Sequence, residues 1–571
     1  MFFDNLGKVI FNNGIFEAAT VRADVNRIKY FADARGLRSG ITAVAVTRNE
    51  MLLYIIIAMI ESNATFLPID LSLPKDRVRY MLDNAKVSNI LVSEEEQIGA
   101  YGDYNYILTN RATVIGEETD YNCCDCEPDY CNPAYVLYTS GTTGKPKGVE
   151  VTAKGFFNFI NAIPDAVNIR KCKTAACFTS FSFDIFFLEA VLCLVNGITV
   201  VLADDEEQIN PKKMLGLIRK YEIDCLQMTP SRMRLLLMCT GDWAETEKTN
   251  FLQNVKVIML GGEKLTDELL NKVKHMTKAT VYNMYGPTET TIWSSVSDLT
   301  MKDKTDIGVP IKNTSIYCLD ENGEQAAIGE TGEIVIGGAG LANGYIGQPE
   351  LTAKAFVTLP FEPYERVYRT GDMGYFDDAM VLHYEGRTDS QVKLHGFRVE
   401  LEEIEEAVNN IAGVEVSAVC FDSEADRLVC FYVAGTEKKE NEIKLKLADV
   451  LPVYMIPSRL FRINELKYTV SGKLDRKALL KTLSHAESSG VEYYDDIEKS
   501  VMEVFWKNFS DSGIFSCDIR LSGIGIHSIN YIQVIVELEE IFEIEFDEEC
   551  LRIDYFETIG DIVKYIRDNM E

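Results

Sequence analysis

The chain has 571 residues, of which 47% are hydrophobic and 25% charged, a composition typical of a soluble globular protein with about three to five domains. A formal net charge of −31 at pH 7 excludes a general nucleic-acid binder, which needs a basic surface. The longest apolar run, Met51–Ile60, is too short for a membrane span, and the first residues lack the pattern of an export signal. We therefore expect a cytoplasmic protein without a membrane-spanning segment.

The first half of the chain alternates short β-type runs with helical periods. Ile41–Val46 and Asn89–Val92 are predicted strands, and Asn49–Ile60 between them is a predicted helix that is buried. This alternation predicts a parallel sheet covered by helices. Further strands in the same rhythm are predicted at Ala134–Leu137, Ala175–Phe178, Thr199–Leu202, Cys225–Met228 and Lys256–Leu260.

The pattern changes in the second half of the chain. Short strands with Gly-rich turns between residues 314 and 344 predict a small β subdomain, and residues 386–480 predict a mixture of strands and helices. The polar stretch Ser484–Gly490 is a predicted linker. Two helices are predicted beyond it, at Ile497–Phe509 and Ile529–Ile541.

The C-terminal segment is strongly acidic. Residues 490–571 contain 20 acidic and 6 basic residues. Such a surface is suited to electrostatic docking with basic partners.

Four of the 14 cysteines lie close together, at Cys123, Cys124, Cys126 and Cys131. Their spacing fits no standard pair of zinc hooks and no histidine lies nearby, so an irregular surface loop is favoured over a metal site. The other cysteines are scattered. Without an export signal, we expect them to be free buried thiols.

Residues 138–148 read Tyr-Thr-Ser-Gly-Thr-Thr-Gly-Lys-Pro-Lys-Gly and follow a predicted strand. The glycines let the backbone turn sharply and approach a ligand, the hydroxyls can donate to phosphate oxygens, and the two lysines supply positive charge. Only two residues separate Gly141 from Gly144, whereas a Walker A loop requires four. A plain polar turn is the alternative, but so many hydroxyls, glycines and lysines together favour a phosphate-binding loop.

This loop resembles the phosphate loop of adenylate-forming enzymes, which include acyl-CoA synthetases, luciferases and the adenylation domains of nonribosomal peptide synthetases. Further segments resemble motifs of that family and follow the family's order along the chain. They are Ala64–Asp70, Phe181–Asp184, Asn283–Glu289, Gly329–Glu333 with Gly344 and Tyr345, Tyr368–Asp372, Gly386–Asp389 with Gln391–Lys393, and Ser471–Asp475. One such match can arise by chance, whereas an ordered series along most of the chain is specific.

The resemblance implies an α/β multidomain protein with the adenylate-forming fold. Residues 1–388 would form a large N-terminal subdomain of α/β sheets with a small β-barrel-like part, and residues 389–482 a small mobile α+β subdomain. A linker at 483–494 would lead to a peptidyl carrier domain at 495–571, expected to be a four-helix bundle. Asp389 would be the hinge about which the small subdomain rotates after adenylation.

The resemblance also implies an ATP site. Adenylation joins a carboxylate to the α-phosphate of ATP and releases pyrophosphate, so the protein must neutralise and align two anions. The phosphates would be bound by Thr139, Ser140, Gly141, Thr142, Thr143, Gly144 and Lys147, with a contact from Thr288. Adenine and ribose would be bound by Asn283, Tyr285, Asp372 and Arg387. Glu289 would hold Mg²⁺, which takes one or two protein carboxylates beside phosphate oxygens.

Two lysines are the implied catalytic residues. Lys473 would contact the substrate carboxylate and the phosphate oxygens during adenylation, and rotation at the hinge would then replace it with the loop that begins at Lys393. Taken singly, Asp372 could be a turn residue and Lys473 a solvated loop charge. The ordered motifs favour the functional interpretation of both residues.

Asp184 indicates an amino-acid substrate, because the family's peptide-synthetase members use an Asp at this place to pair with the substrate ammonium. The family's pocket positions correspond here to Asp184, Ile185, Leu188, Gln227, Met259, Gly261, Met284, Ile292, Trp293 and Lys473. This set resembles the family's glycine-type pocket, with Met in place of Leu at two positions, a volume-conserving change. Large side chains that fill the pocket would exclude larger amino acids, although rejection of alanine, one methyl larger, would be incomplete.

The segment Leu521–Ile529 resembles the phosphopantetheine site of carrier domains, with Ser528 as the attachment residue. A helix N-cap is the alternative role for this serine. The implied activity is ATP-dependent activation of glycine, followed by thioester transfer to the phosphopantetheine arm on Ser528. The implied partners are a phosphopantetheinyl transferase, a condensation or other synthetase domain in another chain, and in some relatives a small helper protein.

Two other functions remain open. One is a different adenylate-forming ligase, such as an acyl- or aryl-CoA ligase or a D-alanine-type carrier ligase, although Asp184 and the carrier-like segment argue against it. The other is an inactive scaffold domain.

Overall fold

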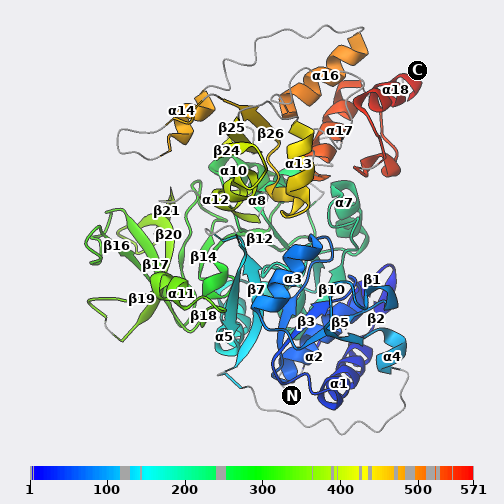
Figure 1. Ribbon diagram of the computed structural model, residues 1–571. Helices are drawn as coiled ribbons and strands as arrows, with labels where there is room; N and C mark the ends of the chain where they lie inside the picture. Colours follow the sequence, from blue (N-terminus) through cyan, green and yellow to red (C-terminus); the bar gives the residue numbers. More distant parts are fainter. Residues whose placement is uncertain are drawn as a thin grey trace. The chain divides into compact units, whose positions relative to one another are not determined.

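The computed structural model describes residues 3, 5–115, 129–130, 132–141, 145–239, 252–362, 364–387, 391–394, 397–422, 427–434, 440–463, 465–467, 474–481, 496–509, 521, 528–542, 544–553 and 555–569. The chain divides into two compact units (Figure 1). Unit 1 comprises Met1–Thr139, Pro146–Leu236 and Trp243–Asp389, and unit 2 comprises Ser140–Lys145, Leu237–Asp242 and Ser390–Glu571.

The largest sheet of unit 1 has nine strands. Their order is β15 (Val309–Pro310), β14 (Ser295–Asp298), β13 (Thr280–Tyr285), β12 (Val257–Gly261), β11 (Cys225–Met228), β9 (Thr174–Cys177), β10 (Thr199–Leu202), β1 (Val9–Phe11) and β2 (Gly14–Phe16). Pairing is parallel from β13 through β1, as the alternating pattern predicts. The β1–β2 hairpin was not predicted, because strands of three residues are too short to show a periodic pattern.

A second sheet of unit 1 has seven strands. Their order is β18 (Gly344–Tyr345), β8 (Lys147–Thr152), β7 (Pro133–Thr139), β4 (Thr65–Pro68), β3 (Ile41–Ala45), β5 (Asn89–Val92) and β6 (Asn105–Leu108). The strands from β7 to β6 run parallel, which confirms the predicted parallel sheet. The antiparallel pair β7 and β8 flanks the predicted phosphate loop.

The helices of unit 1 connect and cover these strands. They are α1 (Ala18–Ala34), α2 (Glu50–Glu61), α3 (Lys75–Asn84), α4 (Arg111–Ile115), α5 (Ala153–Ala166), α6 (Cys193–Val195), α7 (Pro211–Lys220), α8 (Pro230–Met238), α10 (Asp267–Met276) and α11 (Pro349–Ala355). A π-helix, η3 (Phe187–Leu192), precedes α6, and the 3₁₀ helices are η1 (Glu95–Gln97), η2 (Ile169–Lys171) and η4 (Thr288–Thr290).

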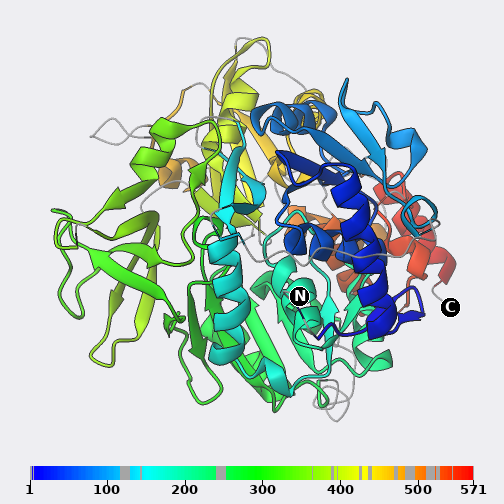
Figure 2. The same cartoon turned by 90° about the horizontal axis from the view of Figure 1, so that it is seen from below.

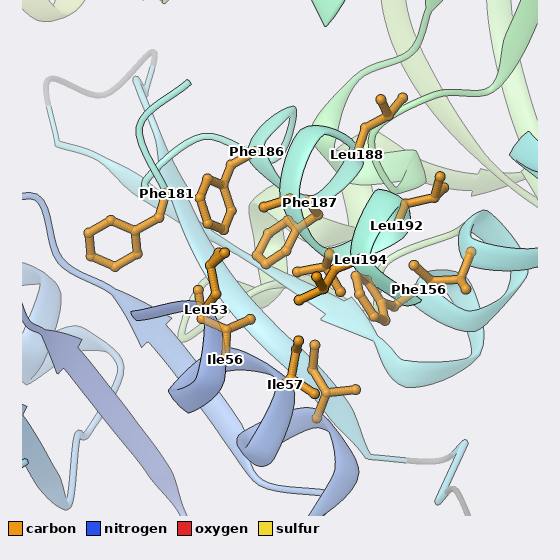
Figure 3. Close-up of a cluster of buried hydrophobic side chains, with 14 of the residues drawn as sticks. Leu53, Ile56, Ile57, Phe156, Phe181, Phe186, Phe187, Leu188, Leu192 and Leu194 are labelled. Carbon is orange, nitrogen blue, oxygen red and sulfur yellow. The ribbon is translucent and has the colours of Figure 1, made fainter. Parts of the chain in front are cut away.

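Helix α2 forms part of the centre of the unit 1 core. The Asn49 side chain caps its first turn by accepting from the backbone N–H of Leu52, and every residue from Met51 to Glu61 is buried. Figure 3 shows Leu53, Ile56 and Ile57, one stripe of the helix, turned toward the aromatic ring of Phe187. The predicted burial of this apolar run is therefore confirmed. Within the described ranges, no helix is both long and apolar enough to cross a membrane.

The small β part of unit 1 is a five-stranded sheet, to one side of α5 in Figure 2. It contains β16 (Thr314–Leu319), β17 (Gly332–Gly338), β20 (Arg366–Phe376), β19 (Phe356–Thr358) and β21 (Leu382–Arg387). The long strand β20 pairs with β17, and it also pairs with both β19 and β21 along its length. Its described strands thus form an open sheet, where the resemblance predicts a barrel-like part.

Unit 2 begins with two small sheets. These are the pair β22 (Gln391–Leu394) and β23 (Phe397–Glu400), and a three-stranded sheet of β24 (Val414–Asp422), β25 (Arg427–Ala434) and β26 (Arg459–Arg462). Their helices are α12 (Leu401–Asn409), α13 (Glu440–Ala448), η5 (Val453–Met455) and α14 (Arg476–Lys481). The mixture of strands and helices predicted for this part of the chain is confirmed.

The C-terminal part of unit 2 is helical in the residues that the structure describes. Helices α16 (Asp496–Phe509), α17 (Ser528–Phe542) and α18 (Ile559–Asn569), with the 3₁₀ helix η7 (Glu548–Leu551), share one hydrophobic cluster. Phe505, Tyr531 and Ile562 are fully buried members of that cluster. The predicted helices at 497–509 and 529–541 are confirmed, and the four-helix carrier bundle stays a prediction.

All nine cysteines in the described part of the chain are free, and eight of them are buried, as expected. The cluster Cys123, Cys124, Cys126 and Cys131 lies outside the described residues.

Candidate active site

Four predicted pocket residues lie on one face of the nine-stranded sheet. Gln227 on β11 is paired with Met259 on β12, and Gly261 on β12 is paired with Met284 on β13. Side chains two positions apart on a strand point to the same face, so Met259 and Gly261 share a face with their partners. The register therefore brings together residues that are up to 57 positions apart in the chain.

The ring of Trp293 packs against Gly261 on this face of the sheet. A Cβ atom on Gly261 would lie 2.6 Å from Cη2 of Trp293 and 2.5 Å from the carbonyl oxygen of Met284. Both distances are shorter than van der Waals contact, so only glycine fits at position 261. Trp293 and Ile292 are buried, which agrees with the expectation that large side chains fill this space.

The loop that carries Trp293 has an unusual backbone. Thr291 and Ile292 have φ angles of 63° and 71°, in the left-handed region. This region is unfavourable for β-branched residues, because their side chains clash with the backbone. Two consecutive residues of this kind indicate a loop that is held by its surroundings, and such strain is concentrated at functional sites.

Asp184 begins a segment that also contains the predicted pocket residues Ile185 and Leu188. Its Oδ2 accepts a hydrogen bond from the hydroxyl of Thr288 over 2.7 Å. Ile185 is buried and faces Gly262, where an added Cβ would lie 3.2 Å from Ile185 Cδ1. Leu188 is on the π-helix η3 and is fully buried. A hydrogen bond therefore connects Asp184, the carboxylate predicted to bind the substrate ammonium, to Thr288, the residue predicted to contact the phosphates.

Three of the predicted nucleoside-binding residues are joined by hydrogen bonds. The hydroxyl of Tyr285 donates to Oδ2 of Asp372 over 2.6 Å, and Nη1 of Arg387 donates to Oδ1 over 2.6 Å. Arg387 also donates to the carbonyl oxygen of Thr370 over 2.9 Å. An ionised carboxylate has about four acceptor sites, so Asp372 retains capacity for ribose hydroxyls. Burial raises the pKa of the Tyr285 phenol well above its ordinary value, and the adjacent Asp372 charge adds to the shift.

Asn283 lies two residues before Tyr285 on β13 and is buried. Its amide nitrogen donates to the carbonyl oxygen of Asp306 over 2.7 Å. This bond fixes the orientation of the amide and leaves its oxygen as an acceptor for a ligand.

The predicted magnesium ligand, Glu289, is fully buried. Its Oε1 accepts from the hydroxyl of Tyr345 over 2.8 Å and lies 3.9 Å from the ammonium nitrogen of Lys147. The Lys147 ammonium also lies over the Tyr345 ring, 5.0 Å from its centroid. Tyr345 belongs to one of the family-like motifs, and the structure shows that its hydroxyl contacts Glu289 while its ring lies under the Lys147 ammonium.

The structure describes both ends of the predicted phosphate loop. Thr139 ends β7, Ser140 and Gly141 are buried, and Lys147 begins β8. The Thr139 hydroxyl is buried and has no hydrogen-bond partner among the described residues, as expected of a donor reserved for a ligand. Thr142, Thr143 and Gly144 lie outside the described residues.

The remaining predicted residues belong mostly to unit 2. Lys393 is on β22 and is paired with Arg398 on β23. Ser528 is the first residue of α17, and its side chain lies outside the described part of the chain. Asp389 and Lys473 also lie outside the described residues, so their roles stay predictions.

Comparisons with known proteins place the chain in a family. Residues 20–346 match the family model of the AMP-binding enzymes. The chain is 36% identical to the dimodular nonribosomal peptide synthase of Bacillus subtilis (strain 168) over 448 residues, 76% of this chain and 18% of that protein. It thus spans less than a fifth of the length of that relative.

Two solved structures cover nearly the whole chain. One is holo-PA1221, a nonribosomal peptide synthetase protein with adenylation and peptidyl carrier domains, with a TM-score of 0.82, 22% identity, and coverage of 99% of this chain and 94% of that one. At this identity the likeness shows the fold. The other is holo-AB3403, a four-domain nonribosomal peptide synthetase bound to AMP and glycine, with a TM-score of 0.59, 27% identity, and coverage of 100% of this chain and 42% of that one.

The chain therefore belongs to the AMP-binding enzyme family, and the relative compared above is a nonribosomal peptide synthase. The adenylate-forming α/β fold is confirmed. The predicted enzyme class, an adenylating ligase related to the amino-acid-activating synthetases, is confirmed as well.

Proposed function

We propose that the protein activates glycine as glycyl-AMP, with release of pyrophosphate, and then transfers the glycyl group to the thiol of a phosphopantetheine arm on Ser528, forming a thioester and releasing AMP. The observation that carries the choice of glycine is the contact between Trp293 and Gly261, which closes the pocket face at this point. A filled pocket selects the smallest amino acid by excluding larger side chains. The glycine bound to the related holo-AB3403 supports the same choice.

Asp184 is the proposed partner of the substrate ammonium. Its carboxylate is partly buried and is oriented by the Thr288 hydroxyl, so a cation placed beside it would form a charge-assisted pair. Fatty and aryl acids carry no ammonium group, which is the physical reason to favour an amino acid over them.

The hydrogen-bonded residues Tyr285, Asp372 and Arg387 of unit 1 fit the nucleoside of ATP. Asp372, with Arg387 nearby, would bind the ribose, and Tyr285 would bind adenine. The phosphates would be bound by the loop from Thr139 to Lys147. Glu289 supplies one buried carboxylate, which suits a Mg²⁺ ion that takes its other ligands from phosphate and water. Bound there, the ion would supply charge neutralisation between the two anionic reactants.

The unit 2 residues complete the proposal. Residues 389–482 are the proposed mobile subdomain with Asp389 as the hinge, Lys473 acts in adenylation, and Lys393 enters in the transfer step. Residues 495–571, beyond the linker at 483–494, are the proposed carrier domain. A phosphopantetheinyl transferase would modify Ser528 in the cytoplasm, and a synthetase domain in another chain would accept the glycyl group.

ATP–pyrophosphate exchange with a panel of amino, aryl and fatty acids tests the adenylation step. We expect the strongest exchange with glycine, weaker exchange with alanine, and none after Lys473→Ala. Strong exchange with an aryl or fatty acid and none with glycine would contradict the proposal. Unchanged exchange in Lys473→Ala would show that this lysine is misassigned.

Intact mass spectrometry tests the transfer step. After treatment with a phosphopantetheinyl transferase and coenzyme A, the wild-type chain should gain the mass of one arm, and then of one glycyl group on addition of ATP and glycine. The Ser528→Ala variant should gain neither mass while keeping its exchange activity. An arm on the Ser528→Ala variant, or no arm on the wild-type chain, would contradict the carrier assignment.

A further inference from the structure

A buried carboxylate outside the predicted site residues follows a predicted pocket residue in the chain. Glu189 is 1% exposed and is on the π-helix η3, next to the pocket residue Leu188. One of its oxygens accepts from the backbone N–H groups of Phe178 and Thr179, each over 2.8 Å, and the other accepts from the Thr179 hydroxyl over 2.6 Å. These two residues begin the loop that leads from β9 to Asp184.

Glu189 also holds Gln227. With the Gln227 amide in the orientation that its neighbours require, its nitrogen donates to Oε1 of Glu189 over 2.7 Å, and its oxygen accepts from the Met228 N–H over 3.2 Å. Both polar ends of this buried side chain are therefore fixed. An unanchored glutamine has three rotatable side-chain bonds and would not keep one position at a pocket wall.

The π-helix explains how adjacent residues of one short segment can contribute Leu188 to the predicted pocket and Glu189 to the contacts with Thr179 and Gln227. A π-helical turn contains an extra residue, which changes the direction of the side chains along it, and such turns are frequent at functional sites. In Figure 3, Phe187 points toward α2 while Leu188 points away from it. The following residue, Glu189, then contacts the loop before Asp184 and the strand that carries Gln227.

The charge of Glu189 is balanced from within unit 1. Burial raises the pKa of Glu189 above its ordinary value, whereas the Arg232 guanidinium and the donors of Thr179 and Phe178 act in the opposite direction. Burial likewise lowers the pKa of Arg232, and Glu189 opposes that shift. A buried charge with a counter-charge and several donors is expensive to remove, and it holds its neighbours rigidly.

We propose that Glu189 is a positioning residue for amino-acid selection, which keeps Gln227 and the loop before Asp184 in the arrangement that favours glycine over alanine. The inference rests on the proposed function only in taking this pocket as the amino-acid site. Loss of the Glu189 bond lets Gln227 change rotamer, so the wall no longer excludes a methyl group. One methyl group in a pocket is worth about 10- to 200-fold in selectivity, which limits the size of the effect.

The decisive variants are Glu189→Gln, Gln227→Met and their combination. The first weakens the acceptor, the second removes the amide at similar volume, and both should lower the glycine-to-alanine ratio of kcat/KM by about 5- to 20-fold. The double variant should be no worse than the poorer single variant, because both remove one interaction. The KM for ATP should stay unchanged, which a general loss of structure would not allow.

Asp224→Asn is the matched control. Asp224 is also a buried carboxylate, and it accepts from the N–H groups of Lys173 and Thr174 at the opposite end of β9. This variant should lower the melting temperature without changing the glycine-to-alanine ratio. If Glu189→Gln does not fold, Thr179→Val replaces it, because it removes the hydroxyl donor to Oε1 and should lower the ratio in the same direction.

The results distinguish this inference from the proposed function. A folded Glu189→Gln variant with an unchanged ratio, or additive effects in the double variant, would overturn the inference. If the wild-type chain prefers another amino acid, the choice of glycine is wrong. The coupling of residues 189 and 227 is then measured on that amino acid and its homologue with one more methyl group.

Discussion

The hydroxyl of Thr288 donates a hydrogen bond to Oδ2 of Asp184 across 104 positions of the chain. The next residue, Glu289, is bonded to Tyr345 and lies near Lys147. The short helix η4 therefore contacts the proposed ammonium partner through one residue and the proposed phosphate side through the next. This arrangement gives a physical connection between the proposed sites of the two substrates.

Thr288→Val should weaken amino-acid binding, because it removes the donor that orients Asp184. A hydrogen bond to a charged group is worth about 1.5–3 kcal/mol when buried, and since Asp184 is only partly buried we expect the KM for glycine to rise about 5- to 10-fold. Thr288→Ser keeps the hydroxyl and should stay close to the wild type. Exchange kinetics at varied glycine and varied ATP measure both KM values, and an effect on ATP alone would assign Thr288 to the phosphates only.

Gly261→Ala should destabilise unit 1 and lower exchange activity. The new Cβ would lie within 2.6 Å of Trp293 and 2.5 Å of the Met284 carbonyl, so the pocket wall has to move. Overpacking of this kind costs about 1–3 kcal/mol. Gly216→Ala on the exposed side of α7 is the control, because nothing lies within 4 Å of its Cβ position and alanine favours a helix by about 0.5–1 kcal/mol. The melting temperature measured by thermal unfolding should therefore fall for Gly261→Ala and rise for Gly216→Ala.

Tyr285→Phe should raise the KM for ATP by about 5- to 10-fold, because it removes the donor that holds Asp372. Burial and the Asp372 charge raise the pKa of the Tyr285 phenol well above its ordinary value, so it stays protonated and keeps donating as the pH rises. The ratio between variant and wild-type KM should thus be constant from about pH 7 to pH 10, the ordinary phenol pKa. A ratio that falls toward 1 over this range would show that the phenol ionises.

Glu289→Gln should reduce exchange activity by about 100-fold or more, because a preorganised charge contact at the reacting phosphates is lost. The remaining activity should need a higher Mg²⁺ concentration, since a neutral amide binds this ion weakly. Glu330→Gln, at an exposed turn outside the site, should behave as the wild type. The Mg²⁺ dependence of exchange measures the effect, and an unchanged dependence would move the metal site elsewhere.

Much of the fold could be predicted from local patterns. The run Met51–Ile60 is apolar at every position, which predicts burial directly, and the strands at Thr199–Leu202 and Cys225–Met228 have the predicted bounds. The β1–β2 hairpin was missed, because its strands are stabilised by pairing with β10 and not by their own three-residue sequences. The open form of the five-stranded sheet likewise depends on how β20 pairs along its length.

For the site, the ordered motifs of the sequence were enough to predict the class of chemistry and the candidates Asp184, Glu289 and Asp372. They could not predict the hydrogen bonds that hold the site residues, in which Thr288 donates to Asp184, Tyr345 to Glu289, and Gln227 to Glu189. The physical reason is that motifs are contiguous in sequence, whereas a buried polar group is satisfied by whatever donor or acceptor the fold brings within about 3 Å. Those partners lie tens of positions away, and strand register and helix geometry select them.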